Sequence, residues 1–301
     1  MKEIKHKPVL LNEVIENLDL KQDDVVFDGT LGSGGYSEEI LKKLSEDKGL
    51  LIATDLDSNS INISQKRLGK RKNLKIFQDN FKNIEKILKK LGLKKINKAV
   101  LDLGWSSDQF QNSGRGLSFQ NLEEPLDMNL TDLDEKKKIT AYEILNFWEE
   151  EEIADLIFKY GEEKGSRLIA KGVVDFRKKQ KIEKVKDLVE IIEKAVGKFY
   201  KNKKIHSATK TFQALRIYVN QEFKVLEEAI ENIVKVLETD GRLAIVTFHS
   251  LEDKIIKQKF LDLEKKDLTK RLNKKVIKPK WDEVKKNRRS RSAKLRVLIK
   301  K

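Results

Sequence analysis

VVFDGTLGSGG, the stretch from Val25 to Gly35, decides the fold of this chain. Val25–Phe27 is a β-branched and aromatic run typical of a buried strand, and it ends at Asp28. A glycine-rich turn follows, and a helical pattern covers Ser37–Leu44. Glycines let backbone N–H groups approach a ligand, and the N-terminus of a helix attracts negative charge. The stretch therefore predicts a nucleotide site.

Further strand patterns alternate with helical ones through the first third of the chain and return near its end. They cover Leu50–Thr54, Leu74–Gln78, Lys98–Leu101, Leu243–Phe248 and Leu295–Ile299. Only helical patterns lie between, at Ala141–Phe147, Glu150–Tyr160, Ser166–Phe176 and Val185–Val196. The order predicts an α/β fold with a Rossmann-like, doubly wound, mostly parallel sheet. We expect this domain to span residues 1–112 and 212–301, with residues 113–211 as an inserted all-helical domain.

The basic residues are concentrated at the end of the chain. The net charge is +15, and Arg271–Lys301 alone holds 14 Lys or Arg against two acids. Such clustering is typical of a partner with a phosphate backbone, although it can also be a solvated tail. Arg289 and Arg291 stand just before the strand pattern Leu295–Ile299, which a loose tail would not contain. We therefore expect both arginines to contact a nucleic acid.

Composition excludes several kinds of site. The chain has no cysteine, which rules out disulfides, thiolate zinc sites, cysteine-ligated clusters and a cysteine nucleophile. With only three histidines besides, no metal site is expected. No apolar run approaches the length of a membrane span, and the N-terminal residues lack the pattern of a signal peptide. We expect a cytoplasmic protein.

Charge next to the glycine turn indicates which nucleotide binds. Asp55 ends the second strand pattern, where its carboxylate can accept hydrogen bonds from both ribose hydroxyls. A dinucleotide fingerprint would need a third glycine where Ser37 stands, and Asp28 would repel a pyrophosphate. Asp28 can instead receive the amino group of a methionine moiety, which favours S-adenosylmethionine over NAD. The alternative is that the glycines only make turns and Asp55 caps a helix.

Nine motifs together resemble the MraW-type 16S rRNA cytosine-N4 methyltransferases of bacteria. They are His6–Val14, Asp28–Gly35, Asp102–Ser107, Arg115–Phe119, Pro125–Met128, Tyr160–Glu163, Thr211–Ile217, Phe248–Asp253 and Arg289–Arg296. The resemblance implies a class I methyltransferase that moves a methyl group from S-adenosylmethionine to N4 of one decoding-centre cytosine, cytosine 1402 of 16S rRNA. It implies the rRNA or the small ribosomal subunit as partner, neither DNA nor a membrane, and leaves a homodimer open.

The resemblance also implies which residues contact the cofactor. They are Gly34, Gly35, Tyr36, Asp55, Phe81, Asp102 and Gln109. The sequence departs from the family pattern at several positions. Tyr36 stands where histidine is usual, and Asn129 and Lys210 replace arginines, which puts bidentate phosphate contacts at those two positions in doubt.

The chemistry of an amine methyltransferase predicts further roles. The exocyclic amine of cytosine is a poor nucleophile, so an acceptor at the amine would localise its lone pair and take the proton. We expect Asp102 or a nearby carbonyl to accept, and Trp105 to pack on the flipped-out base. The alternative is that Asp102 only holds the cofactor and Trp105 covers the pocket. Methylation at C5 normally needs a cysteine, so its absence closes that route.

Other residues are expected at the substrate, and other functions remain open. His249 and Ser250 end a strand pattern and are expected to line the base pocket. The alternative for His249 is an ordinary structural role. Arg216 either touches RNA or ties the insert to the sheet. A non-catalytic ribosome-binding factor that keeps a cofactor pocket is the main alternative function. An NAD-dependent oxidoreductase is disfavoured by Asp28 and Ser37.

Overall fold

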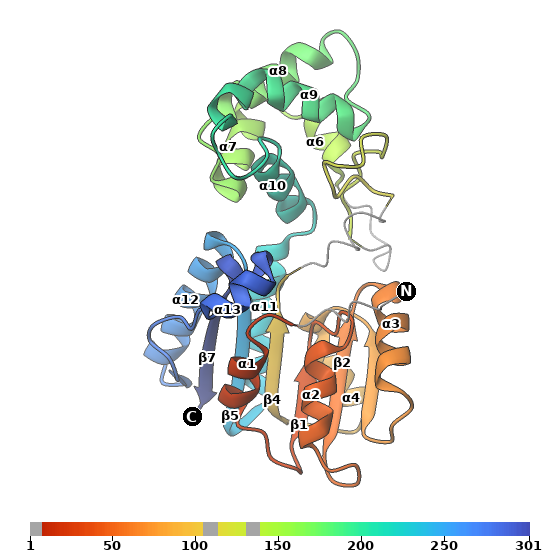
Figure 1. Cartoon of the computed structure of the whole chain (residues 1–301), viewed down its shortest axis with the longest axis vertical. Coiled ribbons are helices and arrows are strands. Elements are labelled where there is room, and N and C mark those ends of the chain that lie inside the picture. The colour runs from red at the N-terminus through yellow and green to blue at the C-terminus, as the bar shows by residue number, and fades with distance from the viewer. Residues whose placement is uncertain (1–7, 105–113, 131–138) are drawn as a thin grey trace. The chain divides into compact units, whose positions relative to one another are not determined.

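A computed structural model describes residues 8–104, 114–130 and 139–301, apart from the side chain of Arg289 (Figure 1). The chain forms two compact units. The sheet unit comprises Met1–Gly104 and Phe223–Lys301, and the helical unit comprises Trp105–Glu222. The chain therefore builds part of a sheet, leaves to form a separate helical body and returns to complete the sheet, as the order of the patterns predicts.

Seven strands form one sheet in the order β3-β2-β1-β4-β5-β7-β6. They are β1 (Val25–Asp28), β2 (Leu50–Asp55), β3 (Leu74–Gln78), β4 (Ile96–Asp102), β5 (Leu237–Thr247), β6 (Thr269–Arg271) and β7 (Lys294–Lys300). Strands β1 to β5 pair in parallel, and β7 pairs antiparallel with both β5 and β6. This confirms the predicted Rossmann-like, mostly parallel sheet. The carboxyl ends of β1, β2, β4 and β5 consequently meet at one edge.

Helices cover both faces of the sheet (Figure 1), and alternate strand residues pack against helices on opposite faces. Val26 and Leu51 pack in a cluster with residues of α1 (Leu11–Leu18) and α2 (Gly35–Lys43). Phe27 and Ile52 face the other way, into a cluster with residues of three further helices. These are α4 (Ile84–Lys90), α11 (Glu222–Val236) and α12 (Ser250–Lys265). Each such side chain contributes about 1.5–3 kcal/mol on full burial, so packing on both faces stabilises the sheet that carries this edge.

The helical unit has its own hydrophobic core. Among the described residues of this unit, the helices are α6 (Ala141–Phe147), α7 (Glu150–Gly161), α8 (Ser166–Arg177), α9 (Val185–Val196) and α10 (Thr209–Val219). Buried residues from all five, such as Ile144, Ile157 and Leu215, form one cluster. The four predicted helices are confirmed here. The fifth, α10, contacts α7 extensively and lies wholly within this unit, although the expected boundary at 211/212 falls inside it.

The C-terminal residues are part of the sheet, so the description of them as a loose solvated tail is wrong. Asp253 on α12 accepts hydrogen bonds from Nε of Arg296 at 2.6 Å and Nζ of Lys294 at 2.9 Å. β7 matches the predicted strand, whereas the short β6 was not predicted and β5 begins six residues before its expected start at Leu243.

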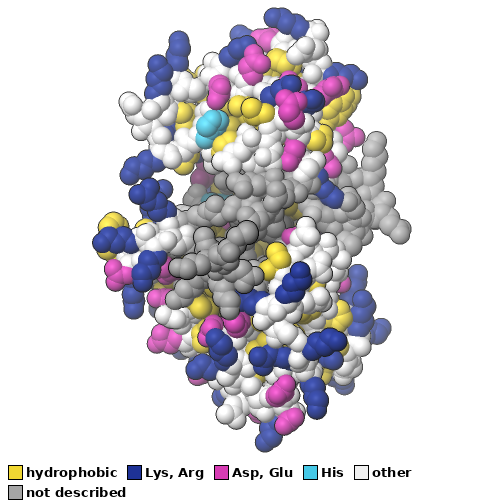
Figure 2. All heavy atoms as spheres, turned by 45° about the vertical axis from the view of Figure 1, so that its right-hand side comes forward, with side chains coloured by type: hydrophobic (Ala, Val, Ile, Leu, Met, Phe, Trp, Pro, Cys, Tyr) yellow, Lys and Arg dark blue, Asp and Glu magenta, His cyan; other side chains and the backbone are white. Residues whose placement is uncertain are grey.

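Charged side chains cover much of the surface. Lys and Arg are spread over the visible faces of both units (Figure 2). None of the helices in the described residues is both long enough and apolar enough to cross a membrane.

Candidate active site

Three of the strands end in aspartates: Asp28 at β1, Asp55 at β2 and Asp102 at β4. Because β2, β1 and β4 are neighbours in the sheet and run in parallel, these three strand-end acids lie side by side at its carboxyl edge. Ligands of open α/β sheets bind at this edge. The acids predicted from the sequence are thus brought together by the topology.

Backbone hydrogen bonds fix the glycine turn between β2 and β4. Gly29 N–H donates to the carbonyl of Val100 at 3.0 Å, and Leu31 N–H donates to that of Thr54 at 2.9 Å. Gly34 has a φ of +80°, which a side chain would strain, and an added Cβ there would also come within 3.2 Å of Ser64. The turn leads directly into α2, whose first N–H groups have no partner within the helix.

Asp28 is fully buried beneath this turn. Its Oδ1 accepts from the backbone N–H of Thr30 at 3.2 Å, and its Oδ2 accepts from the hydroxyl of Ser37 at 2.6 Å. Burial raises the pKa of Asp28 to about 6, against the lowering effect of these two hydrogen bonds. The charge of Asp55 adds to the increase. A nearby cation would therefore stabilise the ionised form.

Asp55 supports the turn and retains acceptor capacity. Its Oδ2 accepts from the N–H of Gly32 at 2.8 Å, and its Oδ1 accepts from the N–H of Asp57 at 2.9 Å. Burial raises the pKa of Asp55, and the same backbone hydrogen bonds oppose that increase. A carboxylate offers about four lone-pair positions, so each oxygen can still accept from a hydroxyl such as those of a ribose.

Asp102 is the least satisfied of the three acids. Its backbone N–H donates to the hydroxyl of Thr30 at 2.6 Å, but its buried Oδ1 has no hydrogen-bond partner among the described residues. Burial raises the pKa of Asp102 to about 8, and the charges of Asp28 and Glu252 add to this, while the N–H of Gly104 opposes it. A buried acceptor without a partner is costly. Its position therefore fits a ligand that brings a donor or a positive charge.

Gly104 follows Asp102 and packs against the end of the next strand. A Cβ on Gly104 would lie only 2.5 Å from a ring carbon of Phe248, which follows β5. Only glycine therefore fits between the acid and this ring. Trp105 and Gln109, expected at the base and the cofactor, lie outside the described residues.

Phe81 and Tyr36 both lie next to the glycine turn. Phe81 begins the 3-10 turn after β3, and its Cβ would be 2.9 Å from a Cβ added to Gly29. Tyr36 is buried in α2, and its hydroxyl donates to the carbonyl of Val9. Burial, followed by the charges of Asp102 and Asp28, raises the pKa of Tyr36 well above its usual value. The hydroxyl of Tyr36 thus joins the start of α2 to the segment that precedes α1.

His249 caps α12 at the same edge, a role that the sequence did not indicate. Its Nδ1 accepts from the N–H of Glu252 at 3.3 Å, while Oε2 of Glu252 accepts from the N–H of Phe248 at 2.9 Å. Nε2 of His249 lies 2.8 Å from Oε1 of Glu252 but forms no hydrogen bond with a described residue. Ser250 is the first residue of α12. Both predicted pocket residues therefore stand at the carboxyl edge, with His249 already in a structural interaction.

The predicted arginines differ in their surroundings. Arg216, in the helical unit, donates from Nε and Nη2 to Glu222 at 2.7 and 3.1 Å, and its side chain is only 11% exposed. This pairing supports the role of a tie between elements over that of an RNA contact. Arg291 is exposed in the 3-10 turn Arg288–Ser292. The side chain of Arg289 lies outside the described structure.

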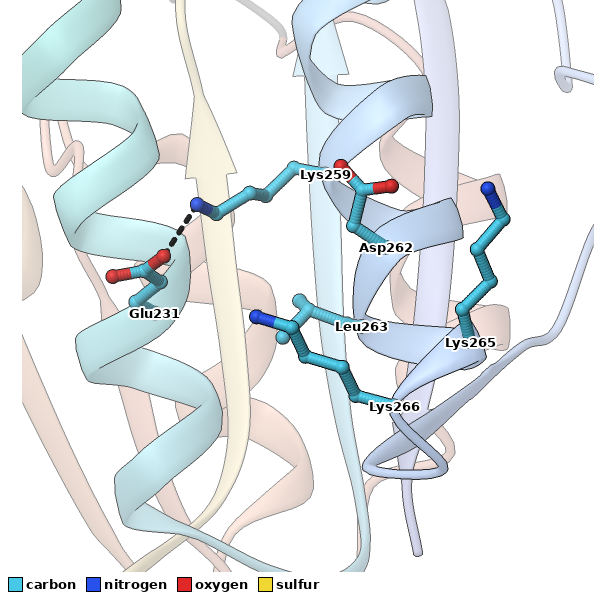
Figure 3. A pocket seen from close by; sticks show the side chains of 6 residues that line it. All are labelled: Glu231, Lys259, Asp262, Leu263, Lys265 and Lys266. Atoms are coloured by element: carbon cyan, nitrogen blue, oxygen red, sulfur yellow. Dashed lines mark hydrogen bonds and ion pairs between the residues drawn. The ribbon is translucent and has the colours of Figure 1, made fainter.

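A separate depression of about 390 Å³ lies between α11 and α12 (Figure 3). It is lined by Glu231, Lys259, Asp262, Leu263, Lys265 and Lys266, and an ion pair joins Lys259 to Glu231 across it. It adjoins the last turns of α12, whereas the strand-end acids lie at the edge where α12 begins. It is therefore not part of the candidate site. No group of three potential metal ligands occurs among the described residues.

The model of the MraW methylase family matches residues 3–301. A ribosomal RNA small subunit methyltransferase H from Clostridium botulinum (strain Kyoto / Type A2) is 44% identical over 314 residues, covering 99% of each chain. A protein of the same name from Dictyoglomus thermophilum is 44% identical over 293 residues, covering 97% of this chain and 95% of that one.

Proposed function

The chain belongs to the MraW methylase family, and we propose that it transfers a methyl group from S-adenosylmethionine to rRNA of the small ribosomal subunit. The acceptor we propose is N4 of a decoding-centre cytosine, cytosine 1402 of 16S rRNA. The observation that carries the proposal is the set of three strand-end acids around a glycine turn at the carboxyl edge of the sheet, of which Asp28 is fully buried and Asp55 and Asp102 are partly buried.

The residues present fit this cofactor. S-adenosylmethionine supplies an electrophilic methyl group on a sulfonium, and it also carries an ammonium and a ribose. Asp28 and Asp102, with raised pKa values and one unpartnered oxygen, can accept positive charge. Asp55 keeps lone pairs for the ribose hydroxyls, and Phe81 lies beside the turn, where an aromatic face can stack on adenine.

Asp102 is proposed to act on the target amine as well. Its free Oδ1 can accept a hydrogen bond from the amine, which localises the lone pair of the amine, and a pKa of about 8 suits it to take the proton. The charge of Asp28 raises this pKa, so Asp28 makes Asp102 a better base. Methylation at C5 is not proposed, because that route normally needs a cysteine and the chain has none.

The helical unit is proposed to select the RNA. It is inserted between β4, which carries Asp102, and α11, which precedes β5. The target base must leave its stack to reach an acid of the sheet unit. A separately folded body inserted at this point in the chain is suited to hold the flanking RNA.

A methylation assay tests the function. Small subunits from cells that lack the modification are incubated with the protein and labelled S-adenosylmethionine, and the product nucleoside is mapped by mass spectrometry. We expect N4-methylcytidine at a single position. Methylation at C5, on a ribose or on another base would contradict the acceptor, and the absence of any transfer would contradict the function.

The Asp102→Asn variant separates the two roles of Asp102. If Asp102 acts on the amine, turnover falls by at least about 100-fold while the dissociation constant for S-adenosylmethionine changes less. A loss of affinity with unchanged turnover at saturating cofactor would restrict Asp102 to holding the cofactor.

A further inference from the structure

We propose that Trp281 stacks on an unpaired base of the substrate RNA, and that cations around α13 (Trp281–Lys286) bind the flanking phosphates. This inference rests on the proposed function and adds a specific contact to it. Trp281 is 72% exposed, the highest exposure among the large hydrophobic side chains of the described residues. An exposed aromatic ring can stack on a base of the RNA. Such stacking stabilises the complex without selecting a particular base sequence.

The charge around Trp281 favours a nucleic acid over a protein partner. We define the C-terminal basic surface as Lys278, Lys280, Lys285, Lys286, Arg288 and Arg291, all of which are exposed. None of the six forms an ion pair with another described residue. By contrast, Arg271, Lys294, Arg296 and Lys301 are paired with acids of the sheet unit. The structure thus separates structural cations from cations that are available to phosphates.

Charge alone would not single out this surface, because Lys and Arg are spread over both units (Figure 2). The combination with an exposed aromatic ring is what distinguishes it. Base stacking on an aromatic side chain beside a basic groove is the usual way in which single strands are bound. Paired bases already stack on each other, so the preferred occupant is an unpaired segment.

Two hydrogen bonds lead from α13, through Leu10 and Val9, to Tyr36 near the start of α2, the helix that follows the glycine turn. Glu283 of α13 accepts from the N–H of Leu10 at 2.8 Å, and the neighbouring carbonyl of Val9 accepts from the hydroxyl of Tyr36. The charges of Asp28, Asp102 and Glu283 all act on Tyr36. The C-terminal basic surface therefore lies on the same side of the sheet unit as the acids. RNA bound there would run close to the base that is methylated.

Replacement of Trp281 tests the stacking. Binding is measured by fluorescence anisotropy with a labelled single-stranded oligoadenylate and with the matching duplex. We expect Trp281→Ala and Trp281→Leu to weaken binding of the single strand by at least about fivefold. Trp281→Phe should retain most of the affinity, and binding of the duplex should change little. If Trp281→Leu binds like the wild type, the ring serves as an apolar contact for a protein and the proposal is wrong.

The salt dependence separates stacking from charge. Trp281→Ala should weaken binding at every salt concentration without changing the slope of log affinity against log salt. Lys285→Ala/Lys286→Ala should reduce the slope by about 1.4, since each phosphate contact to a single strand contributes about 0.7. The matched control is Lys89→Ala/Lys90→Ala, two exposed cations in the last turn of α4 at the opposite edge. An equal change in the control pair would overturn the assignment of the basic surface.

The same preparations distinguish this inference from the proposed function. A wild-type protein that methylates subunits while Trp281→Ala binds RNA equally well would overturn the stacking alone. A wild-type protein that binds S-adenosylmethionine but no RNA would overturn both. The affinity of Trp281→Ala for S-adenosylmethionine should equal that of the wild type, which shows that the variant is folded.

Discussion

The hydroxyl of Ser37 donates a 2.6 Å hydrogen bond to Oδ2 of Asp28, and both side chains are completely buried. Ser37 stands where a dinucleotide fingerprint would have its third glycine. The residue that departs from that fingerprint is thus the one that holds the first strand-end acid. In this chain the helix after the glycine turn supports a carboxylate that would repel a pyrophosphate.

Replacing Ser37 by alanine should destabilise the protein by about 1–3 kcal/mol, because a buried oxygen of Asp28 loses its partner. Since the hydrogen bond lowers the pKa of Asp28, affinity for S-adenosylmethionine at neutral pH should fall as well. Urea unfolding and calorimetric titration measure the two effects. Ser64→Ala is the matched control, because Ser64 is equally buried but donates to a neutral carbonyl, that of Ile61. An equal loss of affinity in the control would contradict the role of Ser37.

Affinity for S-adenosylmethionine should rise with pH. The cofactor is cationic, so it favours the ionised forms of Asp28 and Asp102, whose pKa values are about 6 and about 8. Binding therefore releases protons, and the affinity should increase by up to about 50-fold between pH 6 and pH 7.5, mostly through Asp102. Calorimetry in two buffers of different ionisation enthalpy counts the protons. A dissociation constant independent of pH, with no proton released, would argue against a cation beside these acids.

Asp102→Asn should change how stability depends on pH. The folded-state pKa of Asp102, about 8, exceeds the value of about 3.9 in an unfolded chain. The protonated carboxyl therefore makes its full contribution to the free energy of unfolding below about pH 3.9, and this contribution is lost as the pH rises towards 8. Asparagine cannot ionise, so the variant should gain about 1–3 kcal/mol relative to the wild type between pH 5 and pH 8. Urea unfolding without cofactor measures this, and a difference that is constant with pH would contradict the assigned pKa.

Asp253→Asn should have the opposite pH dependence and a larger cost. Although burial alone would raise the pKa of Asp253, hydrogen bonds from Arg296 and Lys294 hold it below its usual value. The ionised carboxylate of Asp253 therefore contributes to the free energy of unfolding at neutral pH, and this contribution is lost as the pH falls below about 4. Because the side chain of Arg296 is only 7% exposed, we expect a loss of about 3–5 kcal/mol at pH 7.

The exposed pair of Lys42 and Glu39 provides the control for that experiment. Glu39→Gln should leave the unfolding midpoint unchanged, since solvent screens this pair. Thermal unfolding of both variants at pH 7 and pH 3.5 makes the comparison. Equal effects of the two substitutions on the unfolding midpoint would contradict a larger stabilising contribution from the Asp253 ion pairs.

Local patterns predicted most of the fold. Strand and helix positions follow from residue periodicity, and the ends at Asp28, Asp55 and Asp102 follow from where apolar runs stop. The short β6 was missed because Thr269–Arg271 has no apolar period of its own and is a strand only through its pairing with β7. The expected domain boundary at 211/212 fell inside α10 for a similar reason. Whether α10 belongs to the helical unit is decided by its packing against α7, which is a tertiary contact.

The electrostatics of the site could not be predicted in the same way. The pKa of Asp102 depends on burial and on Asp28 and Glu252, which are far from it in the sequence. The capping role of His249 depends on the geometry at the start of α12. The pairing of Arg216 with Glu222 likewise depends on how the chain turns after α10, which the sequence does not reveal. Sequence identified the residue types at the edge, and the tertiary structure determined their protonation and partners.

The chain leaves the sheet unit after β4 and re-enters it at α11, which lies just before β5, the strand that pairs with β4. Both junctions therefore fall between two strands that are adjacent in the sheet. An evolving ancestor could acquire, enlarge or exchange the inserted body without altering the register of any strand. If the helical unit selects the RNA as proposed, donor chemistry and acceptor choice can in this way diversify independently within one polypeptide.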